Sequence, residues 1–433
     1  MSFTLDIDML VPHGPNDAHP SDPRAFGRTS SLTQKRSYKG GFPVDPSPAL
    51  LQTFNNILPT HEPSPATEEA TFRPIWSVRP ASRSIVPDIS LRGTKGAPVY
   101  WSFPPMTSYD WAAVRLRSPL LGVSALAREA TEIDAACEST REGMRIRFNT
   151  GCETRVTVSQ KDGLSIESLR KAAVLFWLLE PTLLMVCAPY RMRSGVGCGS
   201  VQRRSHLTRK QLLYPRGGWP DNLLYFGQFR DPEFKQRVAT LLGKMSKKKG
   251  AEGDIPEQQF RPMMALVAAS TVEHLDSLLR HRGTDETLGL AVQVRDGKAA
   301  LEVRLLEATL DPAELKAFAR ICVSLVQKAV FLRDDTIRSM VSYLCQRTGR
   351  GKVYPWDECL ADVGVDKADI ELFRRKRKQY FPFPGPWQKD AVNVPRPWAV
   401  GPSSAESFLP KLADDPHRLS LTVDEPGRPG LAS

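Results

Sequence analysis

Apolar and acidic side chains alternate along residues 3 to 11, which is typical of a β-strand with one apolar face. One face carries only apolar side chains, namely Phe3, Leu5, Ile7, Met9 and Val11. The opposite face carries Thr4, Asp6 and Asp8. A buried strand does not hide two acids without a partner cation, and a hard divalent metal is the natural partner. The alternative is a half-buried strand whose acidic face is solvated.

Similar patterns predict further strands and helices along the chain. Alternation predicts strands at 111–117, 144–148 and 154–158, and a hairpin at 288–306 with an Asp296-Gly297 turn. Apolar spacing and capping residues predict helices at 120–139, 165–178, 263–279, 312–332 and 334–346. Strands and helices alternate irregularly, so we expect an α+β fold, with a mostly antiparallel sheet and helices on one face.

Composition suggests how the chain is organised. Residues 13–70 are rich in Pro, Ser, Gly and Asn with little periodicity, which predicts a loop or insertion after the first strand at 1–12. The core is expected at 71–335, followed by a helical C-terminal extension at 336–381. Residues 382–433 are proline-rich and predict a disordered tail.

The net charge of +11 raises the question of nucleic-acid binding. Two basic runs carry much of the excess, Lys247–Lys249 and Arg374–Lys378. Such runs can bind phosphate backbones, but a solvated helix face also explains them, and helix C-termini favour cations. The solvated face is the better interpretation, so nucleic acid is not expected as a partner.

Other features bear on location. The first residues lack the basic segment followed by an apolar segment that is typical of a secretory signal, so none is expected. No apolar run approaches the roughly 20 residues that span a bilayer. The seven cysteines are spread out without a Cys-x-x-Cys pair, which favours reduced thiols and argues against a zinc site. We therefore expect a cytoplasmic or nuclear protein with no membrane partner.

Charged residues recur on the polar side of each predicted strand. Besides Asp6 and Asp8, these are Arg115 and Arg117, then Glu153, Arg155 and Thr157, and finally Glu302 and Arg304. If the strands share one sheet with helices on one side, these residues line the other, concave side. Acids mixed with arginines fit an ion- and phosphate-binding floor. Plain cross-strand salt bridging is the alternative.

Three segments resemble motifs of one family, the fungal putative amidoligases. The strand at 3–12 looks like the family's opening F-G-x-E-L-E-x-L-x-x strand. Residues 175–181 and 188–194 are similar to its L-x-W-x-x-E-P and P-x-R segments, and 301–311 to its E-F-R-x-H-x-G-T-L-D motif. The resemblance covers most of residues 1–12 and 110–335.

The resemblance implies a glutamine-synthetase-like carboxylate–amine ligase fold and ATP-dependent amide formation. ATP would phosphorylate a small-molecule or peptide carboxylate, and an amine would displace the phosphate. By position, Asp6, Asp8 and Glu302 would hold Mg²⁺, and Arg191 and Arg304 would bind the phosphates of ATP. Glu302 and Arg304 would be the catalytic residues.

The chain also departs from the family at positions that matter for chemistry. The family's H-V-H-V strand is Arg155-Val-Thr-Val158 here, its last histidine is Leu306, and an expected acid is Arg115. The arginines at two of these places, Arg115 and Arg155, would repel Mg²⁺ in a site of low dielectric. Two hypotheses follow: a divergent ligase, or a non-catalytic relative that binds a nucleotide, anionic metabolite or protein through an arginine-rich pocket.

Overall fold

The first strand, β1 (Ser2–His13), lies inside a seven-stranded sheet whose order is β2-β3-β1-β5-β9-β8, with the short β4 also paired to β1. All of these pairings are antiparallel. The other strands of the sheet are β2 (Ser77–Pro80), β3 (Asp110–Arg117), β4 (Leu121–Gly122), β5 (Thr154–Ser159), β8 (Leu290–Arg295) and β9 (Lys298–Val303). The α+β fold with an antiparallel sheet is confirmed.

The computed structural model describes residues 1–13, 48–58, 76–81, 110–144, 146, 148, 152–188, 191, 200–208, 232–243, 245–246, 255–281, 287–348 and 355–380. Within these ranges a second, two-stranded parallel sheet joins β6 (Met245–Ser246) to β7 (Ile255–Pro256).

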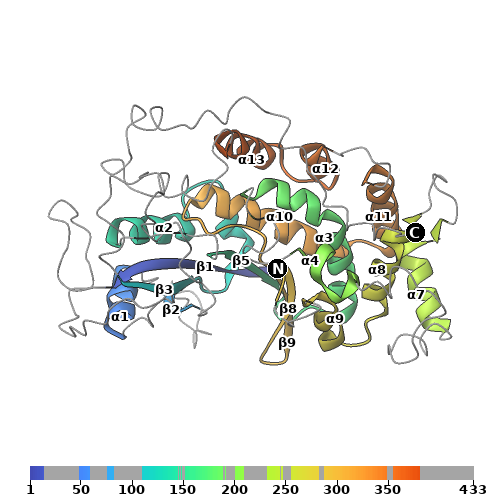
Figure 1. Cartoon of the computed structure of the whole chain (residues 1–433), viewed down its shortest axis with the longest axis horizontal. Coiled ribbons are helices and arrows are strands. Elements are labelled where there is room, and N and C mark those ends of the chain that lie inside the picture. Colours follow the sequence, from blue (N-terminus) through green and yellow to red (C-terminus); the bar gives the residue numbers. More distant parts are fainter. Residues whose placement is uncertain are drawn as a thin grey trace, which may run out of the picture.

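Three helices cover the apolar face of the main sheet: α2 (Glu132–Gly143), α3 (Ile166–Val186) and α10 (Pro312–Phe331) (Figure 1). The alternation of β1 explains this arrangement, because its apolar side chains Phe3, Leu5, Ile7 and Met9 all have 0% exposure. Helix α3 is buried on nearly all sides, and its apolar residues contribute to the same core. The main core therefore lies between the sheet and this helix layer.

The remaining helices lie around this layer. They are α1 (Pro48–Ile57), α4 (Val201–Arg204), α7 (Pro232–Leu242), α8 (Glu257–Ala268), α9 (Val272–Leu279), α11 (Asp334–Thr348), α12 (Trp356–Asp362) and α13 (Lys367–Tyr380), with 3₁₀ turns η3 (Val123–Leu126) and η5 (His206–Thr208). In Figure 1, α12 and α13 lie beyond α3 and α10, on the side away from the sheet. Among the described helices, none combines the length and apolar character needed to cross a membrane.

Local sequence signals placed most elements correctly. The strands at 111–117 and 154–158 and the hairpin at 288–306 are confirmed, and Asp296 and Gly297 both adopt positive φ angles of 51° and 72° in the turn. The Asp311 side chain caps α10 as predicted, accepting from the backbone N–H of Ala313. Helix α11 covers the helix predicted at 334–346.

Some predictions were wrong in detail. The single helix predicted at 120–139 is instead β4, η3 and α2, because Thr131 and Asp134 form a capping box that starts a new helix. The helix predicted at 263–279 is divided between α8 and α9, since Thr271 caps α9. The loop predicted at 13–70 contains helix α1.

Other predictions fall on parts of the chain outside the described residues. These parts are 14–47 and 59–70 of the predicted loop, the lysine run Lys247–Lys249 and the tail at 382–433. Residues 144, 146 and 148 of the strand predicted at 144–148 are described, and they are not in a strand.

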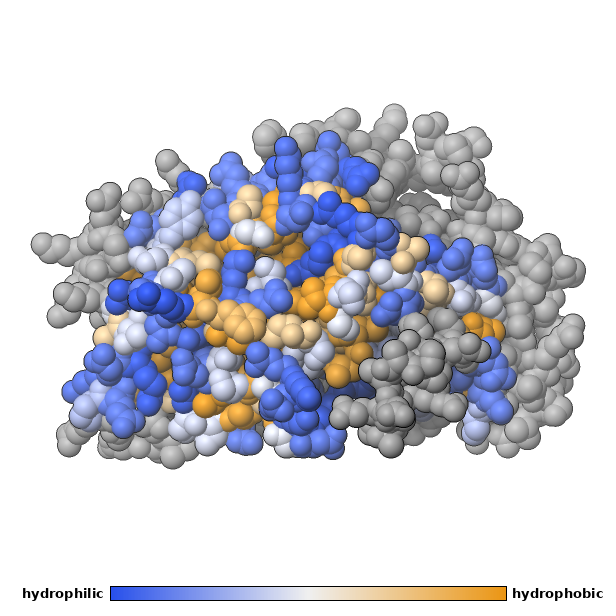
Figure 2. Space-filling view, turned by 180° about the vertical axis from the view of Figure 1, so that it is seen from behind, coloured by the Kyte–Doolittle hydropathy of each residue, from blue (hydrophilic) through white to orange (hydrophobic). Residues whose placement is uncertain are grey.

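The rear surface of the molecule mixes polar and apolar areas. Figure 2 shows hydrophobic residues in the middle of this view and hydrophilic residues along its upper and lower margins. Single exposed apolar side chains are common on protein surfaces, and Phe331 and Leu120, with 68% and 63% exposure, are of this kind.

One glycine is required where a turn touches the sheet. Gly163 has a φ of +84°, and a Cβ there would lie 2.9 Å from the backbone nitrogen of Ala299. Gly297, with a φ of +72°, has open space around it and makes a matched control. Both Gly→Ala variants should suffer the left-handed backbone strain of about 1–2 kcal/mol. Gly163→Ala should lower the free energy of unfolding, measured in urea, by about 1–3 kcal/mol more than Gly297→Ala does, because the backbone at Ala299 has to move away from the new Cβ. Equal losses in the two variants would contradict this.

Candidate functional site

The strand register brings the predicted charged residues onto one side of the sheet. Asp8 lies opposite Arg115 and Asp6 opposite Arg117 on β3, and Asp6 lies opposite Arg155 on β5. Thr157 of β5 in turn lies opposite Glu302 of β9. We call this side the polar face; its charged members in the described structure are Asp6, Asp8, Glu153, Glu302, Arg79, Arg115, Arg117, Arg155, Arg295, Lys298 and Arg304. The prediction that these residues share one face is confirmed.

Asp8 is held by two arginines from neighbouring strands. Arg115 donates from Nε to Oδ1 at 2.6 Å and from Nη2 to Oδ2 at 3.2 Å. Arg155 donates to the same Oδ2 at 3.1 Å. Asp8 has 1% exposure, and burial raises the pKa of its carboxyl although Arg155 and Arg115 oppose the rise, so the cross-strand pairing compensates the buried charge in part. The salt-bridge alternative raised by the sequence therefore describes Asp8 well.

Glu153, just before β5, is the centre of a second ion-pair group. Arg304 and Arg155 both donate to its Oε1, with Nε distances of 2.7 Å and 2.8 Å. Arg191 lies on its other side, with Nη2 3.9 Å from Oε2. Burial alone would raise the pKa of Glu153, but Arg304, Arg155 and Arg191 outweigh it and hold the pKa below the ordinary value.

Arg191 contacts the site from the interior of the protein and not from the solvent-facing side. Its side chain has 0% exposure, and Nη2 donates to the carbonyl oxygen of Leu306 at 2.9 Å. The structure thus brings the predicted phosphate residues Arg191 and Arg304 together around Glu153. Of the two, only Arg304 has a side chain that is partly exposed, at 16%.

Asp6 and Glu302 are less well compensated. Arg117 Nε lies 3.3 Å from Asp6 Oδ1 without hydrogen-bond geometry. Glu302 accepts a long hydrogen bond from Gln293 at 3.4 Å and lies 4.0 Å from Arg304 Nε. Burial raises the pKa of both carboxyls, although nearby arginines oppose the rise.

Buried polar atoms without partners cluster beside Asp6. Within the described part of the chain, Arg117 Nη2 and the hydroxyls of Thr4 and Thr157 find no hydrogen-bond partner. Thr4 lies opposite Thr157, and Asp6 opposite Arg117, so these atoms belong to adjacent positions of β1, β3 and β5. Unsatisfied buried donors and acceptors are rare in native proteins, and a ligand or ordered water would satisfy them.

The three carboxylates predicted to hold Mg²⁺ are not arranged as a ligand set. Arg115 and Arg155 occupy both oxygens of Asp8. No group of three or more His, Cys, Asp or Glu residues able to hold a metal is found among the residues that the structure describes. Asp6 and Glu302 fit a hard cation better, since both are acidic oxygen donors without a close guanidinium hydrogen bond. The metal site stays a prediction.

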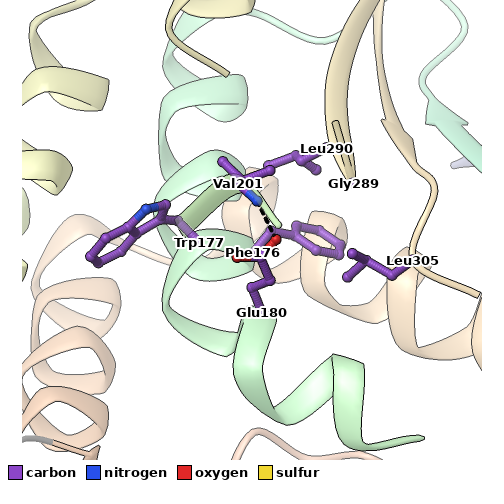
Figure 3. Close-up of a pocket in the computed structure, with 7 residues that line it drawn as sticks. All are labelled: Phe176, Trp177, Glu180, Val201, Gly289, Leu290 and Leu305. Carbon is purple, nitrogen blue, oxygen red and sulfur yellow. Dashed lines mark hydrogen bonds between the residues drawn. The ribbon is translucent and has the colours of Figure 1, made fainter. Parts of the chain in front are cut away.

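A small cavity lies elsewhere, between α3 and the start of β8. Its lining residues are Phe176, Trp177, Glu180, Val201, Gly289, Leu290 and Leu305, and its volume of about 10 Å³ has room for about one water (Figure 3). Glu180 accepts hydrogen bonds from the backbone N–H of Val201 at 2.6 Å and of Gln202 at 2.7 Å. The glutamate of the predicted E-P motif thus anchors the first turn of α4, which is a structural role.

Neither a protein-family model nor a curated protein matches this sequence. The resemblance to the amidoligases therefore stays a prediction.

Sequence reasoning missed the roles of two groups. Glu153 was placed on the polar face but not recognised as the residue that Arg155, Arg304 and Arg191 surround. Thr4 and Thr157 stood out only as hydroxyl positions among charged neighbours. The strand alternation contained both signals, but cross-strand register decides which side chains meet.

The opposite pKa shifts on this face predict opposite pH effects. The pKa of Asp6 is raised above 3.8, so its stabilising effect is complete below pH 3.8 and is lost as pH rises through the folded pKa. The pKa of Glu153 is lowered from 4.5, so its contribution is present above pH 4.5 and is lost as pH falls. Relative to the native chain, Asp6→Asn should therefore gain stability as pH rises above 3.8, and Glu153→Gln should lose stability at pH values above 4.5. Urea unfolding at several pH values measures both trends, and parallel trends would contradict the assignment.

Proposed function

We propose that this protein is a non-catalytic relative of the amidoligases that binds a nucleotide or another anionic metabolite on its polar face. One observation carries the proposal: Arg117 has a buried guanidinium nitrogen, Nη2, with no acceptor among the described residues. The buried hydroxyls of Thr4 and Thr157, on the same face, also have no hydrogen-bond partner in the described structure. A phosphate or carboxylate oxygen is the acceptor that a guanidinium prefers.

The charge balance of the polar face supports an anion. Its arginines outnumber its carboxylates, with Arg79, Arg115, Arg117, Arg155, Arg295 and Arg304 facing Asp6, Asp8, Glu153 and Glu302. The pKa of Asp6 is lowered by the positive charges of four arginines, Arg115, Arg295, Arg155 and Arg79, although burial outweighs them. Several positive charges therefore lie close enough to Asp6 to interact with it. Such an excess attracts an anion and repels a divalent cation.

The proposal includes the glutamine-synthetase-like architecture. An antiparallel sheet with helices on one face and charged residues on the other supports it, as do the three motifs in their expected order. The places where an active relative would have acid or imidazole hold Arg115, Arg155 and Leu306. Arg115 and Arg155 both bind Asp8, so the altered residues stabilise the fold instead of supplying a base.

A divergent ATP-dependent amide ligase is the second candidate, and one observation favours it. Asp6 Oδ1 and the Thr157 hydroxyl are buried oxygen atoms without hydrogen-bond partners in the described structure, and Glu302 lies beside Thr157. Asp6 and Glu302 would hold Mg²⁺ there, and Arg304 would neutralise charge on a transferred phosphoryl group. ATP would supply that group to the substrate carboxylate.

The binding proposal is tested by thermal shift in EDTA with ATP, inorganic pyrophosphate and citrate as probes. At least one probe should raise the Tm of the native chain. Arg117→Gln should weaken that binding about 10- to 100-fold, because a charge-assisted hydrogen bond of about 1.5–3 kcal/mol is lost. Arg333→Gln is the matched control, since the Arg333 side chain is 85% exposed and pairs with the exposed Asp335 in the described structure. Failure of all three probes to shift the native Tm would refute the proposal.

The two candidates differ in their response to Mg²⁺. For the ligase, Mg²⁺ should strengthen ATP binding, and Asp6→Asn should abolish that gain. For the non-catalytic protein, ATP should bind equally well in EDTA, and Asp6→Asn should strengthen binding because a negative charge near the anion is removed. Calorimetric titration of ATP with and without Mg²⁺ separates these outcomes, with the exposed Asp335→Asn as control.

A further inference from the structure

The basic run near the C-terminus contains one lysine that is not on the surface. Lys376 of α13 has 3% exposure, although Arg374, Arg375 and Lys378 of the same run are exposed. The prediction of a solvated basic face is therefore wrong for Lys376. A buried ammonium is costly unless carboxylates compensate it, so its partners indicate what it stabilises.

Lys376 lies between two acidic side chains from the layer beneath α13. Its Nζ is 2.6 Å from Glu307 Oε1 and 3.0 Å from Glu314 Oε2. Burial lowers the pKa of such a lysine, but the two glutamates outweigh burial and hold the pKa above its ordinary value. The group therefore stays charged while it is buried.

Glu307 connects this lysine to the polar face. It has 0% exposure, and its Oε2 accepts from the backbone N–H of Ala188 at 2.7 Å. Its backbone forms an isolated bridge with Glu153, and its carbonyl oxygen accepts from the hydroxyl of Thr154 at 3.0 Å. The segment that follows Arg304 is thus held by two contacts: the ion pair of Glu307 with Lys376 of α13, and the bridge and hydrogen bond to Glu153 and Thr154 at the start of β5.

We infer that Lys376 is a positioning residue for the polar face, acting through Glu307 on Glu153 and its arginines. The binding role of that face rests on the proposed function, but the coupling itself does not. Removing the lysine takes away the ammonium that lies 2.6 Å from the fully buried Glu307 carboxylate, which raises the free energy of that carboxylate in its native position. A shift of the Glu307 side chain toward water then moves the bridge to Glu153 with it.

The other end of α13 provides a matched control. Asp369 accepts two hydrogen bonds from Arg320 of α10, at 2.8 Å and 2.6 Å. This pair also attaches α13 to the helix layer, and the ion-pair partners of Asp369 in the described structure are Arg320 and Arg128, not residues of the group around Glu307. Loosening α13 in general is therefore separable from the loss of Lys376.

Amide hydrogen exchange, resolved to single residues, tests the coupling without any ligand. Three backbone N–H groups report on it: Ala188, bonded to Glu307; Thr154, bonded to the Leu306 carbonyl; and Asp8, bonded to the Glu153 carbonyl. Lys376→Met should speed exchange at all three by about tenfold or more, while Asp369→Asn should speed exchange only within α13. Unchanged rates at Thr154 and Asp8 in Lys376→Met would overturn the inference.

A charge-neutral double variant keeps the test decisive if Lys376→Met does not fold. Lys376→Met with Glu307→Gln removes both charges and keeps an acceptor for the Ala188 N–H. It should fold and restore native exchange at the three amides, because the fully buried side chain at position 307, which links α13 to the bridge with Glu153, no longer carries a charge. A double variant that stays unfolded, or exchanges as fast as the single variant, would contradict the mechanism.

A binding measurement then links the coupling to the proposed function. If ATP binds the native chain, Lys376→Met should weaken it about tenfold and Asp369→Asn should leave it unchanged. If the exchange result holds but no probe binds the native chain, the proposed function fails while the positioning role stands.

Discussion

Charges on the polar face are buried, and the fold depends on compensating them internally. Asp6, Asp8, Glu153 and Glu302 are each 3% exposed or less, so water cannot solvate them. Arginines on adjacent strands supply most of the compensation, since Asp8 and Glu153 each contact two or more guanidinium groups. An uncompensated carboxylate here would cost several kcal/mol. The sequence of β3, β5 and β9 is therefore constrained on the polar side as strongly as on the apolar side.

This constraint extends through the helix layer to the end of the described chain. Glu307 forms a backbone bridge with Glu153, and its side chain is paired with Lys376 of α13. Arg377, the next residue, donates to the carbonyl oxygen of Met185 at the end of α3. The basic run thus includes residues that connect the C-terminal helix to the layers beneath it. Its composition suggested a surface, but two of its members have interior partners.

The same arginines bear on function. In a ligase of the kind that the sequence resembles, carboxylates on the strands would hold metal, and cationic side chains would contact the phosphates. Here guanidinium groups donate hydrogen bonds to Asp8 and Glu153. The neighbouring atoms without partners in the described structure belong to Asp6, Arg117, Thr4 and Thr157. The polar face therefore combines a network of ion pairs with a small group of buried polar atoms that have no hydrogen-bond partner in the described structure, and the proposed anion binding rests on that group.

The sequence by itself determined many of the helices and strands, and the side of the sheet on which the charged residues of the strands lie. Period-two alternation placed Asp6, Asp8, Arg155 and Glu302 on one face, because side-chain direction along a strand is a local property. Capping residues also fixed the starts of α3 and α10. Only the tertiary structure decided which charges pair, since partners such as Lys376 and Glu307 are distant in sequence and meet through packing. Strand order and helix docking set those distances, and local patterns contain no information about either.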